Sequence, residues 1–185
     1  FADIVGDEFF EDRYTIGVWW WELSDFPDRF DEAFDLVDEL WVGSRFVAEA
    51  LAPRTTVPVV PIRVPIEFPV PPPLLPGELG WPGHGFTFLY SFDYNSVFRR
   101  KNPLGVVEAF RRAFEPGDGA HLVLKSINGD RDPRNQELLL AAIAGRPDIT
   151  LIDDYVSARD RDRLTASCDC YVSLHRSEGF GLTMA

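Results

Sequence analysis

The stretch FTFLYSFDYNSVFRRKNPLGVVEAFRRAF, residues 86–114, decides the fold class. It opens with an aromatic and aliphatic run, Phe86–Phe92, of the kind that forms a buried strand. Asn102 and Pro103 then supply an N-cap and a first-turn proline for a helix that reaches about Phe114. The stretch therefore predicts one strand and one helix, joined by a loop rich in basic residues.

The same alternation continues toward the C-terminus. Further strands are expected at His121–Ser126, Ile149–Ile152 and Cys170–Leu174. Helices are expected from Asp132-Pro133 to about Ala144, near Arg159–Ser167 after a capping box of Ser157 and Asp160, and again from about Gly181. Apolar strands that alternate with helices indicate an α/β fold, with a parallel sheet covered on both faces.

The N-terminal part also alternates. Strands are expected at Tyr14–Trp20 and Glu39–Val42, with helices over Asp28–Val37 and from a Ser44 cap to about Leu51. The run Trp19-Trp20-Trp21 suggests sugar stacking, but successive strand residues point to opposite faces. The three rings therefore cannot form one platform, and most of this segment is expected to be core.

Proline divides the two parts. Ten of the 15 prolines lie between Pro53 and Pro82. Because proline has no N–H for a sheet or a helix interior, this stretch is expected to be an extended connector and not core. The predicted organisation is residues 1–52, a connector at 53–84, and residues 85–185.

Composition excludes several classes of protein. The net charge is −12, with 45% hydrophobic and 26% charged residues, which is typical of a globular chain and disfavours nucleic acid as a partner. No apolar run approaches the ~20 residues of a transmembrane helix, although peripheral membrane contact is left open. Two cysteines cannot staple a fold of this size, so a reducing, cytoplasmic location is expected.

The ends suggest a piece of a longer chain. The sequence starts at Phe1 and stops at Met184-Ala185, where a helix is expected to begin. An isolated helical turn has no stability of its own. We therefore expect an internal fragment.

Two loops could bind an anion beyond the carboxyl ends of the strands. In the first, Asp93–Lys101, Lys101 comes just before an expected helix N-terminus, whose N–H groups favour negative charge. In the second, Ser173–Gly181, Gly179 and Gly181 allow a ligand to approach the main chain. The positive charge of Arg99, Arg100 and Lys101 is as expected for a solvated helix face as it is for an anion site.

Other chemistries lack their motifs. The sequence has no P-loop and no G-x-S-x-G nucleophile elbow. Cys168, Cys170 and His175 would lack a fourth ligand for a metal, so no metal or other cofactor is expected.

Three segments together resemble the family 4 (group 1) glycosyltransferases, which have the two-domain GT-B fold. They are LVDELWVGSRFVAEAL (Leu36–Leu51), RRKNPLGVVEAFRRAF (Arg99–Phe114) and ITLIDDYVSARDRDRLTASCDCYVSLHRSEGFGLTMA (Ile149–Ala185). The resemblance implies that residues 1–52 end an N-terminal, acceptor-side Rossmann-like domain. Residues 85–185 would be most of the C-terminal nucleotide-sugar-binding domain.

The resemblance also implies site residues. Lys101 would bind the donor diphosphate, and Glu178 would contact the transferred sugar as the first member of an E-x7-E pair whose second member falls at position 186. The usual Gly-Arg after the first strand is replaced by Ser91-Phe92-Asp93, which leaves the second phosphate-binding cation unassigned. The other donor-binding candidates are Arg99, Arg100, Tyr155, Val156, Ser157, His175, Gly179, Phe180, Gly181 and Leu182.

The implied function is transfer of a hexose from a nucleotide-diphosphate sugar to a carbohydrate or glycan acceptor, with retention of configuration and without a metal. Residues 1–185 alone are expected to be inactive, because the second glutamate and most of the first domain lie outside them. Two alternatives stay open. One is a GT-B-related phosphorylase or epimerase, and the other is a non-catalytic module that binds a protein through residues 1–50, which carry 14 Asp and Glu against 3 Arg.

Overall fold

The computed structural model describes residues 2–66, 70–181 and 184, which form two compact units. Unit 1 contains residues 2–66 and the segment 177–181, and unit 2 contains residues 70–176 and 184. Each unit has its own parallel sheet. The alternation of strands and helices therefore produces the expected α/β class twice.

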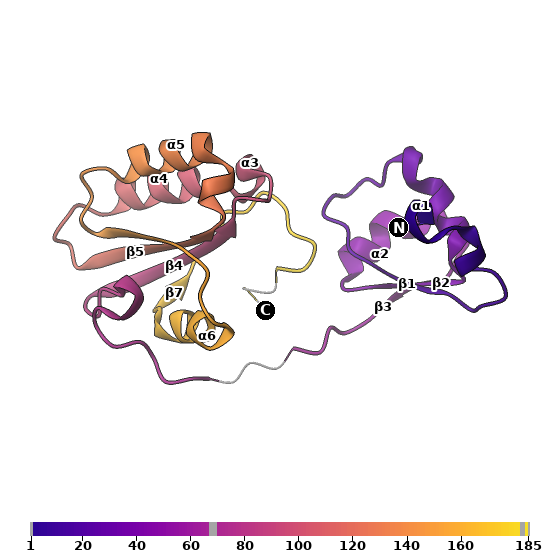
Figure 1. The fold of residues 1–185 in the computed structure, drawn as a ribbon, viewed down its shortest axis with the longest axis horizontal. Coiled ribbons are helices and arrows are strands. Elements are labelled where there is room, and N and C mark those ends of the chain that lie inside the picture. The colour runs from indigo at the N-terminus through magenta and orange to yellow at the C-terminus, as the bar shows by residue number, and fades with distance from the viewer. Residues whose placement is uncertain (1, 67–69, 182–183, 185) are drawn as a thin grey trace. The chain divides into compact units, whose positions relative to one another are not determined.

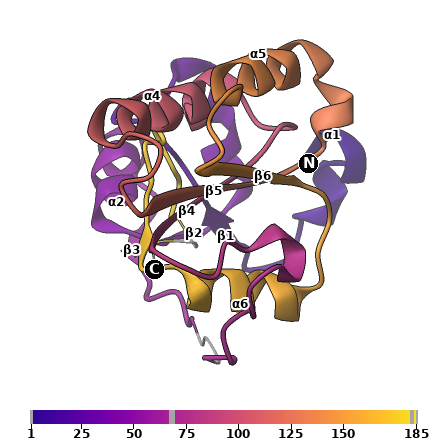
Figure 2. The same cartoon turned by 90° about the vertical axis from the view of Figure 1, so that its left-hand side faces the viewer.

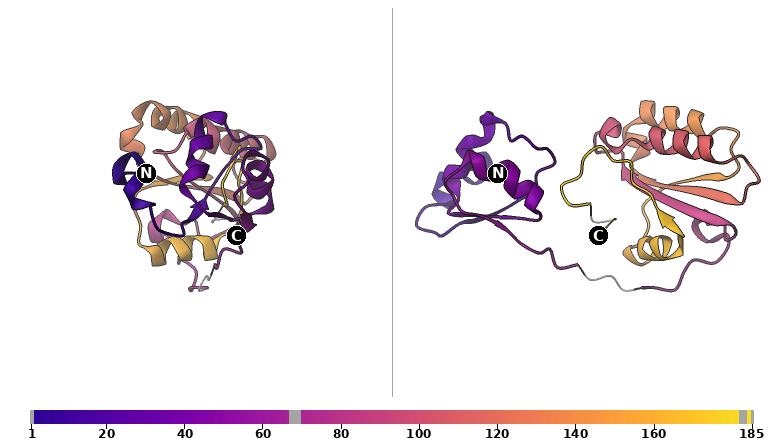
Figure 3. Two further views of the ribbon diagram at one scale, coloured as in Figure 1. Left: turned by 90° about the vertical axis from the view of Figure 1, so that its right-hand side faces the viewer. Right: turned by 180° about the vertical axis from the view of Figure 1, so that it is seen from behind.

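Unit 1 is built on three parallel strands in the order β1-β2-β3. Its ribbon, coloured from indigo to violet, is seen from behind in the right-hand view of Figure 3. Its core consists of Phe26, Phe34, Leu40, Val42, Val47 and Leu51. The elements are α1 (Ala2–Val5), η1 (Asp7–Phe9), β1 (Ile16–Trp19), η2 (Asp28–Leu36), β2 (Glu39–Val42), α2 (Arg45–Leu51), η3 (Ala52–Arg54) and β3 (Val59–Pro61). Ser44 caps α2 as predicted, because its side chain accepts a hydrogen bond from the Val47 N–H.

The segment η2 differs from the expected α-helix. It forms 3-10 turns, although Phe34 is buried in the core as its spacing predicted. Four acidic residues, Asp28, Asp31, Glu32 and Asp35, recur three and four positions apart, and like charges at those spacings destabilise an α-helix. Arg54 pairs with two of them, Asp28 and Asp31, at 2.6 and 2.5 Å.

The boundary between the two units falls within residues 53–84, but the prediction that this stretch contributes nothing to sheet or core is wrong in two places. Val59–Pro61 forms β3, which pairs with β2 at the edge of the unit 1 sheet. An edge strand tolerates proline because one side of its backbone needs no sheet partner. In unit 2, Leu74 and Trp81 are only 6% and 5% exposed and pack with Leu89, Val123 and Leu164.

Unit 2 is a four-stranded parallel sheet in the order β6-β5-β4-β7. Helices α4 and α5 cover one face, and α6 covers the other (Figures 1 and 2). Its elements are η4 (Glu78–Gly80), β4 (Phe86–Asp93), α3 (Phe98–Lys101), α4 (Pro103–Ala113), β5 (Ala120–Ile127), η5 (Gly129–Arg131), α5 (Pro133–Ile143), β6 (Ile149–Asp153), α6 (Ala158–Ser167) and β7 (Cys170–Tyr171).

Two predicted caps of unit 2 are confirmed. The Asp132 side chain accepts from the Asn135 N–H at the start of α5, and the Ser157 side chain accepts from the Asp160 N–H at the start of α6. Strand β7 is shorter than predicted, because only Cys170 and Tyr171 pair with β4 before the chain turns away. The helix predicted from Gly181 falls mainly on positions 182, 183 and 185, outside the described residues. No helix in the described ranges is long and apolar enough to cross a membrane.

Candidate functional site

Four loops leave the same edge of the unit 2 sheet, because the carboxyl ends of β4, β5, β6 and β7 meet there. Ligands of open α/β sheets bind beyond this edge. Helix α3, in the loop after β4, lies beside the yellow loop that follows β7 (Figure 1). This edge of unit 2 is the candidate site.

The last three residues of α3, Arg99, Arg100 and Lys101, form what we call the basic strap. The main-chain oxygen of each accepts a hydrogen bond from another part of unit 2. The Tyr90 hydroxyl donates to the Lys101 oxygen at 2.5 Å. Arg176 donates through its main-chain N–H to the Arg100 oxygen at 2.8 Å and through its Nε to the Arg99 oxygen at 3.1 Å. The strap is therefore fixed against both β4 and the loop after β7.

Asn102 starts α4 in a way that the sequence did not predict. Its side chain makes no capping bond, and its backbone has left-handed φ and ψ angles of 59° and 43°. The side-chain amide instead donates to the Leu174 oxygen at 3.2 Å. Gly105 leaves room for this side chain, because a Cβ at that position would lie 2.6 Å from the Asn102 amide nitrogen and would displace it. Asn102 thus joins the loop after β4 to the loop after β7. The prediction that its side chain caps α4 is wrong.

The position of Lys101 also differs from the prediction. It ends α3 instead of lying in an open loop, and α4 begins two residues later at Pro103. A lysine at the C-terminus of a helix interacts favourably with the helix carbonyls, so Lys101 needs no anion to offset an unfavourable dipole. Any affinity of Lys101 for a phosphate therefore depends on the groups that surround it.

On the other side of the edge, one hydrogen-bonded chain links the ends of three strands. The Asn128 amide nitrogen donates to an Asp93 oxygen at 2.7 Å, and the Tyr155 hydroxyl donates to the Asn128 oxygen at 2.8 Å. Asn128 is buried, whereas the Tyr155 residue is 67% exposed. The chain therefore fixes an aromatic ring that is open to solvent.

Val156 and Ser157, the two other residues predicted near the base, have structural side chains. Val156 packs against the core beneath α6, and the Ser157 hydroxyl caps that helix. Only their main-chain groups and the Tyr155 ring are left for a ligand on this side.

Asp153, at the end of β6, sits in a small polar cradle. Its carboxylate accepts from the Ser126 hydroxyl at 2.8 Å and from the Gln136 amide at 2.7 Å. A Cβ on Gly129 would come within 2.0 Å of an Asp153 oxygen, so a larger residue there would displace this carboxylate. The carboxylate is thus committed to joining β5, β6 and α5.

Lys125 was not predicted as a site residue. It is buried, and its ammonium group donates to the main-chain oxygens of Ser126 and Asp154. Burial lowers the pKa of Lys125, while the nearby charges of Asp153 and Asp154 oppose that shift. A lysine inside an otherwise apolar strand was the available signal. Its contacts show that it fixes the loop that carries Tyr155.

Tyr94, the first residue after β4, brings a hydroxyl into the same region. The residue is 3% exposed and stacks on Phe98, and its hydroxyl has no hydrogen-bond partner in residues 2–66, 70–181 and 184. Burial raises the pKa of Tyr94, and the charges of Asp153 and Asp132 raise it further. The hydroxyl therefore stays protonated and keeps a donor at this edge.

The E-G-F-G segment, residues 178–181, belongs to unit 1. The Phe180 ring lies edge-on to the Trp20 ring, with centroids 5.8 Å apart, and Gly179 lies against Trp20 and Glu22. Gly181 has a left-handed φ of 76°, which favours glycine. Glu178 is half-buried. Leu182, another predicted donor-binding residue, lies outside the described residues.

His175, another predicted site residue, directly precedes Arg176, which bonds to the basic strap. Its ring is half-buried and lies edge-on to Tyr90, with centroids 5.3 Å apart. Tyr90 therefore touches both the strap and this loop.

Cys168 and Cys170 are free thiols, and burial raises the pKa of Cys168. No group of three or more His, Cys, Asp and Glu residues within the described ranges is arranged to hold a metal ion. Asp169 between them has a structural task, because its carboxylate accepts from the Thr87 N–H at 2.8 Å and joins β7 to β4.

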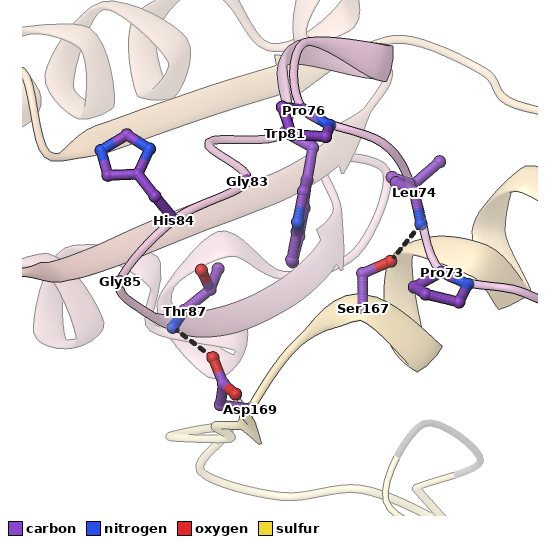
Figure 4. Close-up of a pocket in the computed structure, with 10 residues that line it drawn as sticks. All are labelled: Pro73, Leu74, Pro76, Trp81, Gly83, His84, Gly85, Thr87, Ser167 and Asp169. Atoms are coloured by element: carbon purple, nitrogen blue, oxygen red, sulfur yellow. Dashed lines mark hydrogen bonds between the residues drawn. The ribbon is translucent and has the colours of Figure 1, made fainter.

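A pocket of about 260 Å³ lies at the opposite, amino-terminal end of the sheet (Figure 4). Trp81 and Leu74 line it, together with Thr87 and Asp169 at the starts of β4 and β7. The Ser167 hydroxyl accepts from the Leu74 N–H at 2.6 Å beside it. It is distant along the strands from the strap, and it contains no concentration of positive charge.

No protein-family model matches the chain, and no curated protein matches it either. Solved structures do. The pneumococcal O-GlcNAc transferase GtfA, in complex with UDP and GlcNAc, superposes with a TM-score of 0.63 at 17% identity, over 98% of this chain and 37% of that one. HepE of Anabaena, in complex with UDP and glucose, gives a TM-score of 0.67 at 12% identity, over 93% and 50%. TarM gives 0.60 at 11% identity, over 94% and 34%.

These comparisons define the fold. The chain has the α/β fold of the GT-B glycosyltransferases. It spans half or less of the length of each of these structures.

Proposed function

We propose that the complete protein that contains this chain is a glycosyltransferase of family 4, which moves a hexose from a nucleotide-diphosphate sugar to a carbohydrate or glycan acceptor with retention of configuration. The observation that carries the proposal is the basic strap, three cationic residues fixed at the carboxyl edge of the sheet. Two of the neighbouring structures, those of GtfA and HepE, contain UDP with GlcNAc or glucose, which supports a nucleotide sugar as the donor.

The strap would bind the donor diphosphate. In the transfer, the bond from the anomeric carbon to the diphosphate oxygen breaks, and a bond from that carbon to an acceptor oxygen forms while the acceptor loses a proton. Negative charge grows on the leaving diphosphate, and fixed cations stabilise it. We assign Lys101 to the diphosphate, with Arg99 or Arg100 as the second cation. These charges would act without a metal.

The remaining roles are those that the resemblance implies. Tyr155 and the main chain of Val156 and Ser157 would contact the base. The main chain of Gly179, Phe180 and Gly181, with Leu182, would hold the sugar and phosphates, and Glu178 would contact the sugar. His175 would close the donor site beside Tyr90.

The test uses the complete protein, UDP-glucose and UDP-GlcNAc, with and without a panel of mono- and oligosaccharide acceptors. We expect UDP release that depends on an acceptor, and a product heavier than the acceptor by one hexose or N-acetylhexosamine. The anomeric configuration of the product, read by NMR, should match that of the donor.

The same experiment distinguishes the alternatives. A new sugar nucleotide formed without UDP release would identify an epimerase. A sugar 1-phosphate formed only with inorganic phosphate would identify a phosphorylase. Absence of any UDP-dependent change in the thermal unfolding temperature would favour a non-catalytic module.

A further inference from the structure

Arg176 makes a contact that the resemblance does not assign to any function. It is an exposed residue after β7, and it donates two hydrogen bonds to the strap, 77 residues away in the sequence. Both acceptors are main-chain oxygens, those of Arg99 and Arg100. The bonds therefore fix the backbone of the strap and do not engage its cationic side chains.

We propose that Arg176 is a positioning residue, which holds the basic strap in the conformation that binds a diphosphate. This inference rests on the proposed function of the strap. Its side-chain bond is the informative one, because the main-chain N–H bond to Arg100 survives any substitution except proline.

The hydrogen bond from the Arg176 side chain opposes the electrostatic repulsion within the basic strap. The strap places three like charges on consecutive residues of a four-residue helix, and a helix that short has little stability of its own. Like charges on consecutive residues repel one another, and so short a helix offers little to hold them in place. Hydrogen bonds from Arg176 and Tyr90 to the carbonyl oxygens hold the strap before the anion arrives, so less ordering has to accompany binding.

Arg176 is also the residue at which the chain passes from unit 2 to unit 1. It lies two residues before Glu178. Its bonds to the strap therefore fix the main chain of unit 2 at the last position before residue 177.

The competing explanation is that the guanidinium of Arg176 touches a phosphate itself. Three substitutions separate the two roles. In Arg176→Gln, the amide nitrogen takes the place of Nε, so the donor to Arg99 is kept and the charge is lost. In Arg176→Lys, the charge is kept but a carbon takes the place of Nε. In Arg176→Met, both the donor and the charge are lost.

The experiment measures UDP affinity by calorimetry on the complete protein and on these variants, with Lys101→Ala alongside. Loss of one net hydrogen bond should weaken UDP binding about 3- to 10-fold in Arg176→Lys and Arg176→Met. Arg176→Gln should stay within about twofold of the unsubstituted protein. Binding of uridine, followed by ligand-observed NMR, should be the same in all of them because uridine has no phosphate.

Each other outcome overturns the inference in a recognisable way. Retained affinity in Arg176→Lys with loss in Arg176→Gln would show a direct charge contact. Unchanged affinity in all three, with a loss in Lys101→Ala, would show that the strap needs no positioning by Arg176. Weakened uridine binding would show a general structural defect. Unchanged affinity in Lys101→Ala would overturn the proposed function and this inference together.

Discussion

The hydroxyl of Tyr90, a fully buried residue of β4, donates a hydrogen bond of 2.5 Å to the main-chain oxygen of Lys101. This bond joins the centre of the unit 2 sheet to the residue that we assign to the donor diphosphate. Because the acceptor is a main-chain oxygen, the bond fixes the backbone of Lys101 and does not involve its ammonium group.

Tyr90→Phe should weaken UDP binding, because the Lys101 oxygen loses its partner and the strap gains freedom. The free energy of unfolding should fall by about 0.5–1.5 kcal/mol, the usual net value of one hydrogen bond. Calorimetry with UDP and chemical denaturation measure the two effects.

Tyr171→Phe is the matched control. Its hydroxyl makes one side-chain hydrogen bond of 2.7 Å with Ser91 on the neighbouring strand and does not touch the strap. It should lose a similar amount of stability and bind UDP normally. Equal UDP affinities in the two variants would contradict a role of Tyr90 in the site.

Tyr155 should provide a stacking surface for the base. Its ring is exposed while its hydroxyl is held by Asn128, so the ring is oriented before a ligand binds. Tyr155→Ala should weaken UDP binding by about 1–3 kcal/mol, the scale of one base stacked on an aromatic side chain. Tyr155→Phe should keep most of the affinity, since the ring remains. If Tyr155→Ala binds UDP and uridine normally, the base lies elsewhere.

Stability should fall in acid through a buried ion pair. Arg146 and Asp148 side chains are 7% and 5% exposed and lie 2.6 Å apart. Hydrogen bonding to Arg146 lowers the pKa of Asp148 below its ordinary value of 3.8. A depressed carboxyl pKa adds stability that is complete above the unfolded-state value and is lost as the pH falls through the folded-state value.

Denaturation from about pH 5 to about pH 3 measures this effect. The unsubstituted protein should lose stability over that range, and Asp148→Asn should lose less of it because it has no carboxylate to protonate. Asp148→Asn should also be less stable near neutral pH, by about 1–3 kcal/mol for a hydrogen bond to a charged group. Identical pH profiles would show that another group controls the acid transition.

Local signals predicted much of this fold. The cap residues Asp132 and Ser157 each fix the start of a helix through neighbours three residues away, so their effect is readable in the sequence. The tryptophan run also behaved as predicted. Trp19 and Trp21 both pack against Phe26, while Trp20 faces the other side and is 48% exposed.

Long-range contacts were not readable. Asn102 matched the pattern of an N-cap, but its side chain bonds to Leu174, 72 residues later. The anchoring of the strap by Arg176 and the fixing of Tyr155 by Asn128 depend on which strands are neighbours, and no local pattern specifies that. Leu74 and Trp81 were hidden in a proline-rich stretch, because burial there depends on packing against the sheet.

Lys101 is the residue of the basic strap that we assign to the diphosphate of a nucleotide sugar. The most direct test is calorimetric titration of UDP into the complete protein and into Lys101→Ala. Arg112→Ala is the control, because Arg112 is an exposed cation outside the basic strap and pairs with Glu108 on its own helix. Arg111 is less suitable, because its side chain donates to the Ala142 oxygen and joins α4 to α5.

We expect Lys101→Ala to lose about 1.5–3 kcal/mol of UDP binding, the value of a charge-assisted contact, which is roughly a 10- to 150-fold rise in Kd. Arg112→Ala should bind UDP as the unsubstituted protein does. If Lys101→Ala is folded and its Kd for UDP is unchanged, Lys101 does not bind the diphosphate.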